Sequence, residues 1–236
     1  FGYGRLSPNG NYLYWFEGED WFVYDSERER TVTITKTIDV PFDRQDHDRP
    51  EPARSYGIAG WTDNDKTILL YDRYDIWEIS PDGKESRMIT EGVGREHDLS
   101  FRYINLDRDE YTIDPSQDML LRTMNEETMA AGFYRDRVRG KKEPQKLVMA
   151  DKGFGYPRKA DNADLLLLDR QAFDEYPDLW LADLVFSDMK KITDLGSQMD
   201  PYIWGKAELI DFLSSDGKPL KGIFVKPDNF NPDKKY

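Results

Sequence analysis

Four turn-forming segments recur along this chain at nearly even spacing. They begin at residues 7, 62, 114 and 160, so that successive starts lie 55, 52 and 46 residues apart. Each is rich in Pro, Asn, Asp or Gly, and each is followed after one residue by a short apolar run, as in a turn that leads into a strand. The segments are Ser7–Gly10, Thr62–Asp65, Asp114–Gln117 and Ala160–Ala163.

Two further markers keep a constant order inside each repeat. A third strand is expected to begin near Asp20, Asp75, Gly132 and Asp178, and a fourth to end at Ile34–Thr35, Ile89–Thr90, Val148–Met149 and Ile192–Thr193. A four-stranded antiparallel unit that repeats about every 40–50 residues is typical of a β-propeller blade. One small sheet cannot bury both of its faces alone, whereas stacked neighbours cover it.

The sequence therefore predicts an all-β chain with about four four-stranded antiparallel blades, which form part of a ring, from about residue 5 to 195. Helical periodicity is nearly absent, and only residues 126–131 suggest a single helical turn. A β-sandwich whose turns happen to be evenly spaced is the alternative fold.

Composition narrows the function. The formal net charge is −13, from 33 basic and 46 acidic residues, which disfavours nucleic acid or an anionic membrane as the main partner. The chain has no Cys, and this excludes disulfides, a cysteine nucleophile and thiolate metal sites. No apolar stretch approaches the length of a membrane span. Because Phe1 is not Met and Lys234–Tyr236 stop in mid-pattern, we expect both ends to be cut from a longer polypeptide.

The last part of the chain departs from the repeat. Residues Ala207–Val225 predict a hairpin closed by the turn Ser214–Lys218, and a loop rich in Pro and Asn follows. The blade markers do not continue there. We therefore divide the chain into blades at 1–204 and a separate hairpin segment at 205–236.

At this point a resemblance emerges. The pattern Ser-Pro-Asn-Gly, then Asp-Ile-Trp, then Ile-Thr resembles the WD-like propeller repeats of the prolyl oligopeptidase family of serine peptidases. The stretch from Glu208 to Pro227 is similar to the opening strands of that family's α/β-hydrolase domain, and Lys234–Tyr236 to the segment leading into its sheet. The closest similarity is to dipeptidyl peptidases and acylaminoacyl peptidases.

The resemblance implies a Ser-Asp-His triad, with the serine in a Gly-x-Ser-x-Gly motif. This chain has no such motif, because Gly196-Ser197 is followed by Gln and Met. The two histidines, His47 and His97, both lie upstream in polar stretches, which is typical of solvated loop residues. We expect no catalytic residue within 1–236, and no hydrolysis by this chain alone.

Other candidate sites have simpler interpretations. Asp43, Asp46, His47 and Asp48 suggest a divalent-metal site, but they lack the spacing and the glycine of a Ca²⁺ loop, so no metal and no cofactor are expected. Trp21, Trp77 and Trp180 offer a ligand pocket, but their shared place in the repeat favours packing between blades.

The pair Glu126-Glu127 is of interest because dipeptidyl peptidases of the family hold the substrate's α-amino group with acidic propeller residues. It does not match that motif, and solvent-exposed loop charge is the favoured interpretation. Arg102 lies among aromatic residues and is a candidate for facing a central pore.

Two classes of function remain open. The first is a non-catalytic, substrate-gating propeller segment of a serine exopeptidase that acts on peptides. The second is a free-standing WD-like propeller scaffold that binds proteins or sugars. The sequence identifies no substrate-binding residue and no compartment. It does predict self-association through uncovered terminal blade faces, or a weakly packed hairpin after residue 205.

Overall fold

A computed structural model describes residues 4–235. They form antiparallel sheets, together with the four-residue helix α1 (Val93–Glu96) and the 3₁₀ segments η1 (Asp63–Asp65) and η2 (Leu195–Met199). The predicted all-β class is confirmed. The helical turn suggested at 126–131 is instead a turn that leads into a strand. None of the helices in residues 4–235 is long and apolar enough to cross a membrane.

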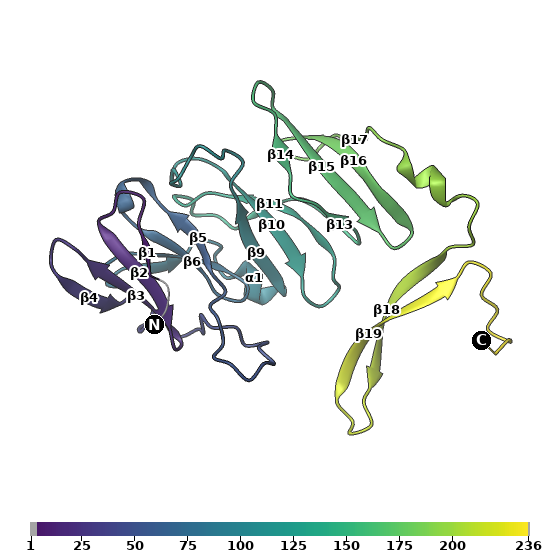
Figure 1. The fold of residues 1–236 in the computed structure, drawn as a ribbon, viewed down its shortest axis with the longest axis horizontal. Coiled ribbons are helices and arrows are strands. Elements are labelled where there is room, and N and C mark those ends of the chain that lie inside the picture. Colours follow the sequence, from purple (N-terminus) through teal and green to yellow (C-terminus); the bar gives the residue numbers. More distant parts are fainter. Residues whose placement is uncertain (1–3, 236) are drawn as a thin grey trace. The chain divides into compact units, whose positions relative to one another are not determined.

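Three four-stranded sheets follow one another along the chain, each with its strands in sequence order (Figure 1). Sheet 1 contains β1 (Arg5–Leu6), β2 (Tyr12–Glu17), β3 (Asp20–Asp25) and β4 (Arg30–Thr33). Sheet 2 contains β5 (Ile58–Trp61), β6 (Ile68–Tyr71), β7 (Ile76–Ile79) and β8 (Ser86–Met88). Sheet 3 contains β9 (Leu99–Ile104), β10 (Met119–Asn125), β11 (Ala131–Asp136) and β12 (Gln145–Ala150).

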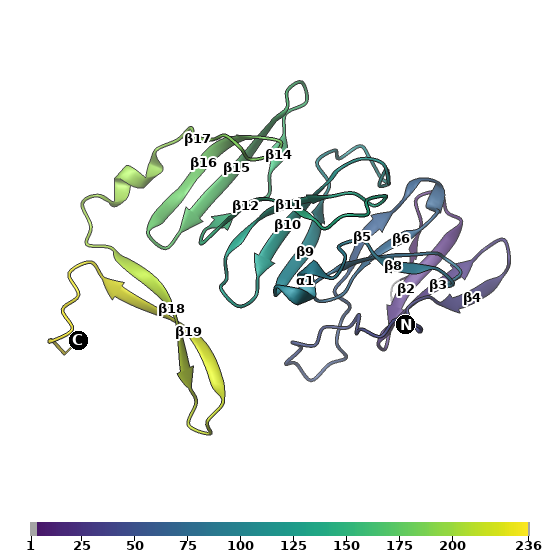
Figure 2. The same ribbon diagram turned by 180° about the vertical axis from the view of Figure 1, so that it is seen from behind.

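Sheet 4 has the same plan with an interrupted first strand. Both β13 (Gly153–Phe154) and β14 (Arg158–Lys159) pair with β15 (Leu165–Ala172), which is followed by β16 (Glu175–Asp183) and β17 (Met189–Lys191). Pro157 lies in the interruption and has no N–H to donate. The hairpin of β18 (Gly205–Leu213) and β19 (Pro219–Pro227) comes last (Figure 2).

The chain divides into two compact units. Unit 1 holds residues 1–127 and 133–149, and unit 2 holds residues 128–132 and 150–236. The boundary predicted at residue 204 separates the blades from the hairpin segment. This division into units does not test it, and it stays a prediction.

Inside unit 1 the sheets stack through two apolar cores. Tyr14, Trp21 and Val23 of sheet 1 pack with Trp61, Ile68 and Leu70 of sheet 2. The opposite face of sheet 2 packs through Leu69, Tyr71 and Ile76 against Phe101 and Leu121 of sheet 3. Strand β6 is therefore buried on both faces, which explains why its four residues are all apolar or aromatic.

A repeated hydrogen-bond motif ties the third strand of three sheets to the segment after the fourth. The hydroxyls of Thr35, Thr90 and Thr193 donate to the carboxylates of Asp20, Asp75 and Asp178, over 2.7, 2.7 and 2.6 Å. The same threonine oxygens accept the N–H groups of Trp21, Ile76 and Leu179. We call this arrangement the Asp–Thr pin. It satisfies backbone groups where strand pairing ends.

Sheet 3 differs at these markers. Gly132 and Val148–Met149 have no carboxylate or hydroxyl, so they cannot form the pin. Val148 and Met149 also lie inside β12, which runs to Ala150, whereas the Ile-Thr markers directly follow β4, β8 and β17. The fourth strand of sheet 3 therefore ends within one residue of the predicted Val148–Met149, but the pin is absent there.

The equivalence expected for three tryptophans is also wrong. The residue whose N–H is bound by the pin threonine is Trp21 in sheet 1, Ile76 in sheet 2 and Leu179 in sheet 4. The residue after it is Phe22 in sheet 1, Trp77 in sheet 2 and Trp180 in sheet 4. Trp21 is thus offset by one residue from the other two and lies on the opposite face of its strand. Trp21 and Trp77 nevertheless pack against the same core from its two sides, as expected for residues between stacked sheets.

The β18–β19 hairpin has apolar side chains on both faces and is largely exposed. In its register Leu209 faces Ile223 and, one residue further along, Ile210 faces Gly222. Consecutive residues of a strand point to opposite faces, so each face carries part of the apolar set. Both strands are exposed over most of their length. The predicted hairpin and its turn are present.

Candidate functional site

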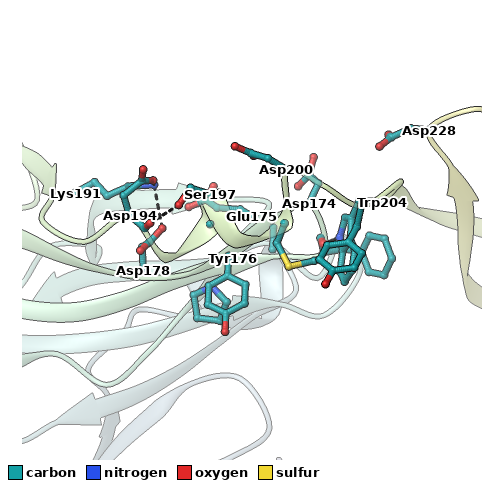
Figure 3. A pocket seen from close by; sticks show the side chains of 16 residues that line it. Asp174, Glu175, Tyr176, Asp178, Lys191, Asp194, Ser197, Asp200, Trp204 and Asp228 are labelled. Carbon is teal, nitrogen blue, oxygen red and sulfur yellow. Dashed lines mark hydrogen bonds and ion pairs between the residues drawn. The ribbon is translucent and has the colours of Figure 1, made fainter.

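An acidic and aromatic groove of about 700 Å³ lies in unit 2 (Figure 3). The turn between β15 and β16 forms one wall and contributes Phe173 and Asp174. Lys191, which ends β17, and the segment around η2 form another wall, while Asp228 follows β19. We call this the unit 2 groove.

One end of the groove shows how its carboxylates bind an ammonium group. Lys191 Nζ lies 2.9 Å from Asp178 and 2.8 Å from Asp194. Hydrogen bonds from the Thr193 hydroxyl and from the Leu195 N–H lower the pKa of Asp178 to about 2, so this carboxylate is charged at neutral pH. The hydrogen bonds to Asp194 and Asp178 raise the pKa of Lys191.

The other end is aromatic. The indole N–H of Trp204 donates to the carbonyl of Phe173, and the two rings lie 5.8 Å apart, which fixes the orientation of the indole. Tyr202 is 67% exposed, and Trp204 is 45% exposed. In Figure 3, Trp204 is drawn beside Asp174, while Asp228 stands apart from them. Asp200 and Asp228 form no ion pair within the described residues, whereas Asp174 lies 3.6 Å from Lys152.

Ser197 lines this groove, but nothing activates it there. Its hydroxyl donates to the carbonyl of Asp194 over 3.0 Å, and the described residues that line the groove include no histidine. His47 Nε2 lies 2.7 Å from the carbonyl of Glu51 within its own loop. The carbonyl of His97 accepts a hydrogen bond from Asn125. Neither histidine is placed as a general base by these contacts.

Glu126 corrects an expectation from the sequence. Its carboxylate accepts from Arg73 Nε at 2.8 Å and lies 2.7 Å from Arg73 Nη2, and it is only 22% exposed. It therefore connects the β10–β11 turn to the β6–β7 turn and is not a solvated loop charge. Glu127 is exposed.

Arg102 does lie among aromatic rings, but its guanidinium is engaged internally. It lies 4.7 Å from the centre of the Tyr71 ring and donates to the carbonyls of Phe101, Asp72 and Arg73. Burial lowers the pKa of Arg102. These contacts identify a structural role, while exposure to a central pore stays a prediction.

The acidic loop in unit 1 is held by its own contacts. Arg44 pairs with Asp46 at 3.0 Å, and Asp43 accepts from the Gln45 side chain. Within residues 4–235, no group of three or more His, Cys, Asp or Glu side chains is placed to hold a metal ion.

Comparison with known proteins gives a result at the level of fold. No protein-family model and no curated protein matches this chain. A solved structure described as a candidate dipeptidyl aminopeptidase IV from Bacteroides ovatus matches all of this chain with a TM-score of 0.63 at 12% identity. The likeness is one of fold. A puromycin hydrolase matches 98% of the chain with a TM-score of 0.54 at 13% identity.

Both similar structures are much longer than this chain. The match covers 35% of the Bacteroides protein and 34% of the puromycin hydrolase, so this chain spans about a third of their length. A third match, to an acylaminoacyl peptidase from Pyrococcus horikoshii, has a TM-score of 0.47. That score is too low to support an argument.

Sequence reasoning missed the unit 2 groove. Its acids are spread from Asp174 to Asp228, and no short motif joins them. The one available signal was the density of Asp, Tyr and Trp between residues 194 and 204, directly before the hairpin.

Proposed function

We propose that this chain is the non-catalytic propeller segment of a prolyl oligopeptidase-family serine exopeptidase, of dipeptidyl-peptidase or acylaminoacyl-peptidase type. In this proposal sheets 1–4 are consecutive blades of a ring that admits short peptides to the active site. The β18–β19 hairpin begins the α/β-hydrolase domain, which carries the catalytic triad.

The observation that carries the proposal is the extent of the fold match. All of this chain, including the hairpin after the last sheet, aligns with about a third of a candidate dipeptidyl aminopeptidase IV. A free-standing propeller has no structural need for a two-stranded segment that is apolar on both faces. The repeated Asp–Thr pin and the stacked sheets of unit 1 supply independent support for blades.

The test is covalent labelling with a fluorophosphonate probe, which reacts with activated serines. We expect no labelling of this chain, and labelling at a single serine in the complete gene product that contains it. The complete product is also expected to release p-nitroaniline from a dipeptidyl or acylaminoacyl p-nitroanilide. Ser26→Ala in the complete product changes an exposed serine outside the groove, and this matched control is expected to leave the rate unchanged.

Two results would refute the proposal. Labelling of this chain alone would place catalysis within residues 1–236. A complete product with no labelled serine and no p-nitroaniline release would remove the peptidase class altogether.

A further inference from the structure

We propose that the unit 2 groove binds an extended basic peptide segment, in which a lysine or arginine adjoins an apolar side chain. The groove has the two features that such a segment needs, an aromatic end and an excess of carboxylates. Such binding does not require that the chain belong to a peptidase.

The volume suits a short peptide. About 700 Å³ falls inside the range of roughly 300–1,000 Å³ that is usual for ligand sites. The aromatic side chains of Phe173, Tyr176, Tyr202 and Trp204 remain 41–67% exposed. Exposed aromatic groups gathered at one place are typical of recognition surfaces, because they bury a large apolar area at little entropic cost.

The negative charge of the groove favours a positively charged partner. Its lining residues include six acids, Asp174, Glu175, Asp178, Asp194, Asp200 and Asp228, against the single base Lys191. Glu175 is neutralised by Arg170 at 2.6 Å and by Lys152 at 3.0 Å. Lys191 already occupies Asp178 and Asp194. Asp174 lies 3.6 Å from Lys152, so Asp200 and Asp228 are the carboxylates left to accept a cation from outside.

The indole of Trp204 lines the same groove as those two carboxylates and offers a second contact for a cation. A lysine or arginine head group placed over an aromatic face is attracted by the ring, and the attraction grows when water is excluded. Because the hydrogen bond to Phe173 already holds the indole, binding does not need to order it. The Lys191 contacts show the same chemistry made within the chain.

The test uses fluorescence anisotropy with a labelled pentapeptide, Gly-Lys-Leu-Lys-Gly, and its partner Gly-Glu-Leu-Glu-Gly. We expect the lysine peptide to bind the chain and the glutamate peptide not to bind. The double variant Asp200→Asn, Asp228→Asn is expected to weaken binding about tenfold, the combined effect of two exposed ion pairs. Raising the salt concentration from about 0.05 M to about 0.5 M screens the ion pairs, so it should weaken binding in the original chain more than in this variant.

The control variant changes the net charge by the same amount, but at positions of unit 2 outside the groove. Asp161→Asn with Asp164→Asn removes two exposed carboxylates that do not line the groove, and it is expected to leave the affinity unchanged. Trp204→Leu keeps an apolar side chain but removes the ring face, and it is expected to weaken binding several-fold.

Three results would overturn the proposal. Equal loss in the two Asp→Asn pairs would mean that net charge alone attracts the peptide. Equal binding of the lysine and glutamate peptides would remove the role of the carboxylates. A doubled mass in light scattering that disappears in Trp204→Leu would show that a second copy of this chain occupies the groove.

Discussion

Strand β6 and the β18–β19 hairpin both carry apolar side chains on two faces, but their surroundings are opposite. β6 is a run of apolar and aromatic residues, and sheets 1 and 3 cover it on both faces. The hairpin also carries apolar side chains on both faces, yet it is exposed over most of its length. An apolar run thus shows that a strand needs cover on both sides, but it does not show what provides the cover.

The sharpest test of this comparison is a pair of truncations. Leu70→Ala removes a fully buried side chain of β6 and is expected to lower the free energy of unfolding of unit 1 by about 3 kcal/mol. Leu213→Ala, at a position that is 70% exposed in the hairpin, is expected to change stability by less than about 0.5 kcal/mol. Urea unfolding of both variants measures the difference. Equal losses would show that the hairpin is covered in solution.

A second test uses a buried acid in the covered region. Burial raises the pKa of Asp136 to about 7; its Oδ1 accepts the Arg137 N–H, and no described residue bonds its Oδ2. In the unfolded chain this carboxyl titrates near pH 4. Its contribution to stability is therefore complete below pH 4 and is lost as the pH rises through 7.

Asp136→Asn removes this pH dependence. We expect it to raise the free energy of unfolding by about 2 kcal/mol at pH 8, and to leave it nearly unchanged at pH 4. Urea midpoints at pH 4, 6 and 8 measure the effect, with the exposed Asp161→Asn as the control. A gain of the same size at pH 4 would show that the proton has no part in it.

The smallest expected effect on stability is in the hairpin itself. Leu209 and Ile223 face each other across β18 and β19, and Ile223 is 75% exposed. If exposed apolar faces drive self-association, Leu209→Asn with Ile223→Asn is expected to reduce the mass seen by light scattering while moving the melting temperature by less than about 2 °C. An unchanged mass would assign any association to another surface, such as the outer face of sheet 1.

The sequence predicts the repeat well because its markers are local. Asp20 and Thr35, Asp75 and Thr90, and Asp178 and Thr193 each stand 15 residues apart, and each pair is hydrogen-bonded in the structure. Turn residues likewise mark the strand ends. Tryptophan is a poor marker of position, because the pin is set by the aspartate. Trp21 comes one residue after its aspartate, whereas Trp77 and Trp180 come two residues after theirs.

What the sequence could not predict depends on distant partners. Glu126 has the appearance of a loop charge until Arg73, 53 residues away, is placed beside it. Helix α1 is too short to show helical periodicity. The unit 2 groove brings together a turn, a strand end and a residue after the hairpin, so its composition emerges only from the fold.

The pins also bear on how neighbouring sheets meet. They align Trp21 in sheet 1 with Ile76 in sheet 2, and each of these residues points toward the next sheet along the chain. Every sheet of unit 1 that has a pin thus offers the same strand position to its successor. The side chain at that position differs, Trp in sheet 1 and Ile in sheet 2, so each interface is packed by its own residues. One local hydrogen-bond motif thus sets which residue of the third strand meets the next sheet.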